Sequence, residues 1–148
     1  MSGRILWLDN DPAQIWSFVR TMRVAGMEVT VASTVSEAEE QLRGGFYDIL
    51  LLDVMIPVTD REIATGYGPR ETDDGLNTGL AFYVRNKHLV TDRTAVLVLS
   101  VRVDGAARAA FIAAGLPPEN FITKFKVRDA SVFLDEIRRH LHADPSSA

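Results

Sequence analysis

The stretch Ile49-Leu50-Leu51-Leu52-Asp53 is an unbroken apolar run that stops at an aspartate, and this pattern decides the fold. Three more runs have the same form: Ile5-Leu6-Trp7-Leu8 before Asp9-Asn10-Asp11, Val96-Leu97-Val98-Leu99 before Ser100, and Phe121-Ile122-Thr123 before Lys124. Runs that are apolar throughout are typical of parallel strands covered by helices on both faces. Because the carboxyl ends of parallel strands share one edge of the sheet, we expect the polar residues to meet there. Three acids, a hydroxyl and a lysine at one edge indicate a site for a divalent cation and a phosphoryl group.

Helical patterns alternate with these runs. Asp11 and Pro12 form a typical helix start, and Gly26 a typical end, so the first helix is expected between them. Ser33 or Thr34 is expected to cap the second helix. The further expected helices span about residues 35–43, 76–88, 104–114 and 130–141, and the second strand is expected at residues 27–32. Five strands alternating with five helices predict a single doubly wound α/β domain over residues 1–148.

Residues 58–75 interrupt this alternation. The segment is polar, contains Tyr67 and three glycines, and shows no sustained periodicity, so we expect an insertion loop after the third strand. Loops this long inside a compact domain are usually functional or mobile. Two interpretations stay open: a lid or partner-binding role, and a tolerated surface insertion. Residues 143–148 are expected to be a frayed tail.

The composition excludes several classes of protein and site. The net charge of −4 offers no basic face, so we expect no direct binding to nucleic acid. The chain has no cysteine, which excludes disulfides, thiolate zinc sites and cysteine nucleophiles. We expect no signal peptide, because the given sequence runs directly into the first strand, and no apolar stretch reaches the length of a membrane span. We therefore expect a cytoplasmic protein without membrane contact.

Taken together, these residues resemble the receiver domain of response regulators, the phosphoryl-accepting part of two-component signalling. The resemblance covers about residues 3–142. It rests on the acidic cluster after the first strand, on Asp53 within residues 51–57, on Ser100 after the fourth strand and on Lys124 after the fifth. Each position also has a structural interpretation, such as a turn cap or a solvated lysine, but all four occur in order on the correct strand ends. The resemblance implies a (βα)5 flavodoxin-like sheet with strand order 2-1-3-4-5.

The resemblance also implies the roles of these residues. Asp53 is the expected phosphoacceptor, and the donor is a histidine kinase or a phosphotransfer protein. Lys124 is expected to form an ion pair with the acceptor and then with the phosphoryl oxygens. Ser100 is expected to donate a hydrogen bond to those oxygens after transfer, and Phe121 matches the family's aromatic switch position. A core role for Phe121 is an equally open alternative.

The expected cofactor is Mg²⁺. By the same resemblance, its protein ligands are the side chains of Asp9, Asn10 and Asp53 and the backbone carbonyl of Met55. The family usually has a second acid where this chain has Asn10, whose amide oxygen coordinates without adding charge and so lowers the expected affinity. Asp11 could compensate, although its position before a proline favours a helix cap.

Two further positions depart from the family. Val101 stands where a small residue is usual, and its bulk narrows the expected access to the acceptor. Phe125 replaces a proline that is commonly cis; without proline the cis form costs about 3–4 kcal/mol, so a trans bond and a differently shaped turn are expected.

The resemblance further predicts how a stand-alone receiver acts. It signals through protein–protein contacts with a downstream target that the sequence does not name. The expected output surface is formed by residues 104–114, 121–123 and 130–141, and a homodimer through this face is one option. Kinase or phosphotransfer partners of the family commonly dock near the first helix, where Trp16 is either an interface anchor or a boundary core residue.

Two other functions are alternatives. A degenerate receiver that is never phosphorylated and acts as a constitutive interaction module is favoured by Asn10, Val101 and the insertion. A phosphohydrolase with an aspartate nucleophile needs a second aspartate two residues later, where this chain has Met55. We therefore expect that the protein is not an enzyme.

Overall fold

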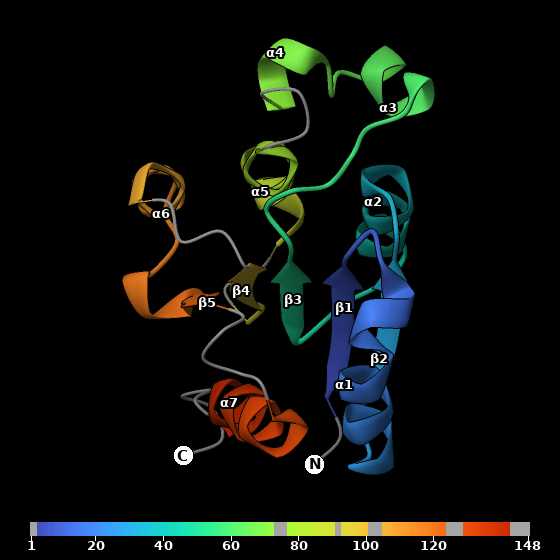
Figure 1. Ribbon diagram of the computed structural model, residues 1–148, viewed down its shortest axis with the longest axis vertical. Helices are drawn as coiled ribbons and strands as arrows, with labels where there is room; N and C mark the ends of the chain where they lie inside the picture. The colour runs from blue at the N-terminus through green and yellow to red at the C-terminus, as the bar shows by residue number, and fades with distance from the viewer. Residues whose placement is uncertain (1–2, 73–76, 91–92, 101–104, 124–128, 143–148) are drawn as a thin grey trace.

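The computed structural model describes residues 3–72, 77–90, 93–100, 105–123 and 129–142, with the side chains of Ser100, Thr123 and His142 excepted. Its centre is a five-stranded parallel sheet with strand order β2-β1-β3-β4-β5 (Figure 1). The strands are β1 (Arg4–Leu8), β2 (Glu28–Ala32), β3 (Ile49–Leu52), β4 (Ala95–Ser100) and β5 (Phe121–Thr123). The predicted flavodoxin-like fold and its strand order are confirmed.

The helices follow the strands as the periodicity predicts. They are α1 (Pro12–Val24), α2 (Val35–Gly44), α3 (Asp60–Ala64), α4 (Pro69–Thr72), α5 (Thr78–Asn86), α6 (Gly105–Ala113) and α7 (Ala130–His142), with the 3₁₀ turns η1 (Lys87–Leu89) and η2 (Pro118–Asn120). Asp11 caps α1 by accepting a hydrogen bond from the backbone N–H of Gln14 at 3.3 Å, and Thr34 caps α2 in the same way through Glu37 at 3.2 Å. Gly26 ends the α1 turn with φ at +93°, a conformation that side chains disfavour.

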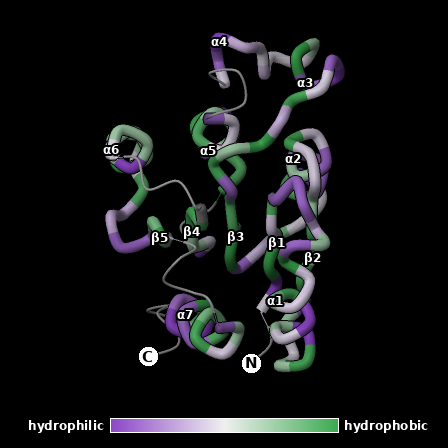
Figure 2. The backbone as a smooth tube through the Cα atoms, viewed as in Figure 1, coloured by the Kyte–Doolittle hydropathy of each residue, from purple (hydrophilic) through white to green (hydrophobic). Residues whose placement is uncertain are grey.

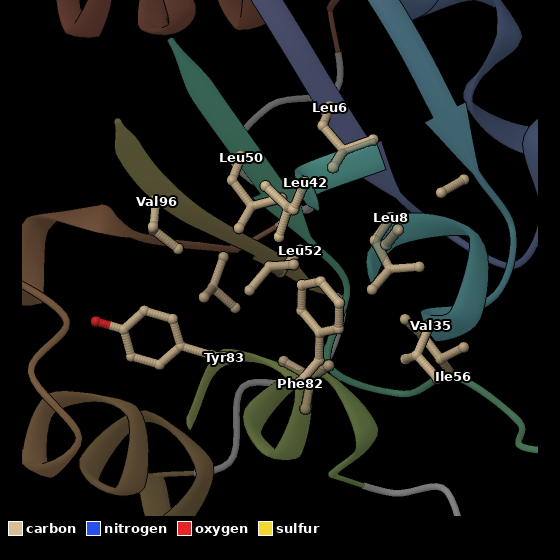
Figure 3. Packing of buried hydrophobic residues seen from close by; sticks show 14 of the residues in the cluster. Leu6, Leu8, Val35, Leu42, Leu50, Leu52, Ile56, Phe82, Tyr83 and Val96 are labelled. Atoms are coloured by element: carbon tan, nitrogen blue, oxygen red, sulfur yellow. The ribbon is translucent and has the colours of Figure 1, made fainter. Parts of the chain in front are cut away.

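The sheet separates two apolar layers. On one face, α2, α5 and α6 cover alternate strand residues such as Leu6, Leu50 and Val96, and Phe82 of α5 points into the middle of this layer (Figure 3). On the other face, α1 and α7 cover the intervening strand residues, with Phe133 of α7 packed on Trp7 at 5.3 Å between ring centroids. Figure 2 shows the strands as predominantly hydrophobic and the helices as mixed. Within the part of the chain described, no helix combines the length and apolar character that crossing a membrane requires.

The insertion differs from the expected loop because it contains two short helices, α3 and α4. These lie beyond α2 and α5 on the side away from the sheet (Figure 1). The reason is local: Thr59 and Glu62 form a capping box that starts α3, with the Thr59 backbone N–H and hydroxyl both donating to the Glu62 carboxylate.

Candidate functional site

Asp9, Asn10 and Asp53, which we call the acid edge, lie directly after the carboxyl ends of β1 and β3. In the pairing of these two strands Leu8 is opposite Leu52, so Asp9 and Asp53 follow matched positions. The backbone N–H of Asp53 donates to the carbonyl of Leu8 at 3.0 Å and extends this pairing by one residue. The register therefore places Asp9 and Asp53 at neighbouring positions of the sheet edge.

The carboxylates of the acid edge are buried. Asp9 is 1% exposed and Asp53 is 8% exposed, whereas Asn10 is exposed. Burial of a carboxylate is unfavourable unless hydrogen bonds or positive charge compensate it, and two neighbouring carboxylates increase that demand. The backbone N–H of Asp11 supplies one such bond, to Oδ1 of Asp9 at 2.9 Å. Such an arrangement favours the binding of a cation.

Asp11 does not join the other two acids, so the expected convergence of three acids is corrected to two. Its carboxylate caps α1, and the residue is exposed. Among the residues that the structure describes, no group of three acidic, histidine or cysteine side chains is arranged to hold a metal. The helix cap explains this result, because the cap turns the Asp11 carboxylate toward the amide groups of its own helix.

The donor set at the acid edge nevertheless suits Mg²⁺. This ion is commonly held by one or two carboxylates and keeps several waters, so two buried carboxylates with an exposed amide beside them are enough protein ligands. The backbone carbonyl of Met55 follows Asp53 by two residues, in the loop that leaves β3. All four expected ligand residues are thus within the described part of the chain.

Several predicted positions lie outside the described residues. They include Lys124, Val101 and Phe125, together with the tail at residues 143–148. Ser100 ends β4 as expected, but its side chain is also outside the described part. The roles given to these residues stay predictions. Phe121 is half-buried, with its ring 6.1 Å from that of Phe111 on α6.

Tyr67 anchors the insertion to the rest of the domain. It is 1% exposed, and its hydroxyl donates to Oε1 of Glu39 on α2 at 2.6 Å while accepting from the amide of Asn86 on α5 at 3.2 Å. The guanidinium of Arg85 lies over its ring, 4.8 Å from the centroid. Burial, together with the hydrogen bond to Glu39, raises the pKa of the Tyr67 phenol, so the hydroxyl stays a donor. Tyr67 therefore attaches the insertion to both α2 and α5.

Glu62 provides a second attachment. Its carboxylate accepts from the Ser36 hydroxyl of α2 at 3.0 Å and from Thr59 within the insertion. Burial opposes ionisation of Glu62, but the hydrogen bonds from Thr59 and Ser36 outweigh it and hold the pKa below its ordinary value. Glu62 therefore remains charged while it is 2% exposed.

The structural roles of Glu39, Glu62 and Asn86 were not predicted from the sequence, although two patterns point toward the first two. Thr59-Asp60-Arg61-Glu62 has the spacing of a capping box, which predicts a helix start inside the insertion. Glu39 lies four residues after Val35, on the apolar stripe of α2, where a charged side chain indicates a buried partner. Neither pattern identifies Tyr67 or Asn86 as that partner.

A cavity of about 420 Å³ lies away from the acid edge, near the amino end of β4. It is lined by Tyr83, Lys87, Val90, Thr94, Ala95, Val96, Gly115, Pro117 and Asn120. The Lys87 ammonium donates to the carbonyl of Ala114 at the end of α6 and lies 5.8 Å from the centre of the Tyr83 ring. These contacts give Lys87 a structural role in joining α5 to α6.

Comparison with solved structures identifies this architecture. A response regulator receiver domain protein from Methanospirillum hungatei superposes with a TM-score of 0.75 and 18% identity over 100% of both chains. A two-component response regulator from Clostridium difficile gives 0.73 and 12% identity, covering 97% of this chain and 98% of its own. The activated N-terminal receiver domain of RstA from Klebsiella pneumoniae gives 0.68 and 19%, covering 93% and 97%.

Sequence comparison adds no relative. No protein-family model matches the chain, and no curated protein matches it. The similarity is thus one of structure over the full length of the chain, at low identity. On that basis the protein has the fold of response regulator receiver domains.

Proposed function

We propose that this protein is a response regulator receiver that accepts a phosphoryl group on Asp53 and signals through protein contacts. The observation that carries the proposal is the acid edge: Asp53 is buried beside Asp9 at the carboxyl edge of a receiver-type sheet. Ligands of open α/β sheets bind in the crevice at this edge.

The proposed reaction modifies the chain itself. A carboxylate oxygen of Asp53 attacks the phosphorus of a phosphohistidine on a kinase or phosphotransfer protein, and the P–N bond breaks. The released imidazole keeps the electron pair and takes up a proton, while Asp53 becomes an acyl phosphate. No separate substrate is turned over, so the protein acts as a switch rather than as an enzyme.

Asp9, Asn10, Asp53 and the Met55 carbonyl are the residues that would hold Mg²⁺. When bound, this cation neutralises the negative charge that develops on the transferred phosphoryl oxygens. The chain's own contribution is placement: β1 and β3 fix Asp9 and Asp53 beside each other, and Lys124 and Ser100 are proposed to contact the phosphoryl oxygens after transfer.

The proposed donor protein docks over α1. Trp16 on this helix is 54% exposed, and the Arg23 guanidinium lies 5.7 Å from the centre of its ring. Tryptophan and arginine are among the residues enriched where protein interfaces gain their affinity.

The proposed output surface comprises α6, β5 and α7. Phosphorylation adds charge and strong hydrogen-bond acceptors at Asp53, and Ser100 and the chain after it are drawn toward the phosphoryl group. Phe121 on β5 packs against Phe111 of α6. A shift of β5 or α6 therefore changes the surface that a downstream protein binds.

The test is Mg²⁺-dependent incorporation of phosphate from acetyl phosphate, a small phosphodonor. Wild-type protein is expected to take up one phosphoryl group, which hydroxylamine removes as it does any acyl phosphate. Asp53→Ala is expected to abolish incorporation. Asp60→Ala, which removes an exposed aspartate of α3, is the matched control and is expected to be labelled like the wild type.

Other outcomes contradict the proposal. Incorporation that persists in Asp53→Ala places the acceptor elsewhere. A wild-type protein that takes up no phosphate and binds no beryllofluoride in the presence of Mg²⁺ is instead the degenerate receiver, a constitutive interaction module.

A further inference from the structure

The first turn of α5 is bonded directly to the loop that follows Asp53. The backbone N–H of Gly79 donates to the carbonyl of Val54 at 2.9 Å, and the Thr78 hydroxyl donates to the carbonyl of Ile56 at 2.5 Å. Thr78 is fully buried and Gly79 is also buried. Two consecutive residues of the helix thus hold two carbonyls of the loop.

Gly79 is required here for space and not for its backbone conformation. A Cβ atom added to it would lie 2.0 Å from the carbonyl oxygen of Asp53 and 3.0 Å from the Cα of Val54. Both contacts are with backbone atoms, which cannot rotate away as a flexible side chain could. Only glycine lets the helix approach the acceptor residue this closely.

The peptide between these contacts carries the carbonyl of Met55. Because the carbonyls of Val54 and Ile56 are both held by α5, the Met55 carbonyl belongs to a peptide unit that is fixed on each side. The start of α5 is itself held from the insertion, since the backbone N–H of Asn77 donates to the carbonyl of Thr72 at 2.8 Å.

We propose that Thr78 and Gly79 are positioning residues for the divalent cation, which they serve by fixing the Met55 carbonyl relative to the Asp53 carboxylate. The inference rests on the proposed function, because the cation is the one that phosphoryl transfer requires. Groups that orient metal ligands without touching the metal typically change its affinity by 10–100-fold when they are removed. Thr78 and Gly79 contact the backbone of the loop, so their effect on the cation passes through the loop.

The experiment compares two buried threonines of the full chain, each of which donates its hydroxyl to a backbone carbonyl. Thr78→Val removes the bond to the carbonyl of Ile56, while the control, Thr72→Val, removes a bond to the carbonyl of Gly68, the residue before α4. Affinity for Mg²⁺ is measured by titration calorimetry, and stability by urea denaturation. Thr78→Val is expected to weaken Mg²⁺ binding by about 10-fold. Thr72→Val leaves the backbone carbonyl that accepts from Asn77 in place, so this variant is expected to lose stability and keep the wild-type affinity.

Thr78→Ser and Gly79→Ala extend the test. The serine variant keeps the hydroxyl and is expected to restore Mg²⁺ affinity to within about twofold of wild type. Gly79→Ala is expected to weaken both binding and stability, because the loop must move to admit the new methyl group.

The outcomes separate this inference from the proposed function. A folded Thr78→Val protein that binds Mg²⁺ as tightly as the wild type overturns the inference and leaves the function intact. Equal weakening by Thr72→Val also overturns it, since the effect is then one of general stability. A wild-type protein that binds no Mg²⁺ overturns both.

Discussion

Two pairs of buried carboxylates in this molecule are held in contrasting ways. Asp9 and Asp53 of the acid edge are adjacent because the pairing of β1 with β3 places them so. Glu39 and Glu62, which attach the insertion, each have their own donors: Glu39 has the Tyr67 hydroxyl and the Arg43 guanidinium, and Glu62 has Ser36 and Thr59.

The difference teaches how to distinguish a binding site from a structural attachment. A buried carboxylate surrounded by neutral and cationic donors contributes to stability and to the uniqueness of the fold. Two carboxylates side by side repel each other, and a fold that brings them together favours a ligand that carries positive charge. Burial alone does not separate the two cases; position does, because Asp9 and Asp53 follow paired strands at the edge where open α/β sheets bind ligands.

The largest effect on stability is expected when Tyr67, which attaches the insertion to α2 and α5, is replaced. Tyr67→Ala removes a fully packed ring and leaves a cavity, so the free energy of unfolding is expected to fall by about 3–5 kcal/mol. Urea denaturation measures this. Ile63→Ala, an exposed position on α3, is the control and is expected to cost less than about 0.5 kcal/mol. Equal stabilities of the two variants would show that the insertion is not packed against α2 and α5.

A sharper change removes only the hydroxyl of the same residue. Tyr67→Phe takes a donor from the buried carboxylate of Glu39, and the expected loss of stability is about 1–3 kcal/mol. The control is Tyr47→Phe, whose hydroxyl donates at 2.9 Å to the side chain of Gln41, an exposed residue that water can solvate instead. If both variants lose the same stability, the Glu39 carboxylate does not depend on Tyr67.

Mg²⁺ is expected to stabilise the protein by binding at the acid edge, and this stabilisation is expected not to depend on the contacts of Glu39. At a concentration ten times its dissociation constant, it stabilises a one-site protein by about 1.4 kcal/mol through binding alone. We expect this increment in the wild type and in Tyr67→Phe, and we expect it to disappear in Asp9→Asn. Urea denaturation with and without Mg²⁺ measures it. An increment that survives in Asp9→Asn would move the cation site away from the acid edge.

The smallest effect concerns pH and Glu62. The pKa of Glu62 in the folded protein is below its ordinary value near 4.5, so the folded state favours the charged form. The resulting stability is present above that ordinary value and is lost as the pH falls through the folded pKa. The stability difference between wild type and Glu62→Gln is therefore expected to shrink between pH 7 and pH 4. A difference that stays constant or grows on acidification would contradict the hydrogen-bonded carboxylate seen here.

The sheet and the acid edge could be predicted from the sequence because their determinants are local. Each strand is a short apolar run, and Asp9 and Asp53 follow their runs directly, so naming the strands also names the edge. The same reasoning wrongly predicted that Asp11 joins the other two acids. The end of a strand shows which residues lie near an edge but not the direction in which a side chain points. The helix cap at the start of α1 set the direction of the Asp11 side chain.

The sequence by itself determined the alternation of strands and helices and the residues at the carboxyl ends of the strands, since hydrophobic periodicity and capping act over a few neighbouring positions. Only the tertiary structure decided the partners of Tyr67, the backbone contact that makes Gly79 necessary, and the burial of Glu39. These contacts join residues as far apart as 28 positions, and their energies depend on distances that no local pattern encodes. The physical reason is that burial and hydrogen bonding across elements are set by packing, which exists only once the chain has folded.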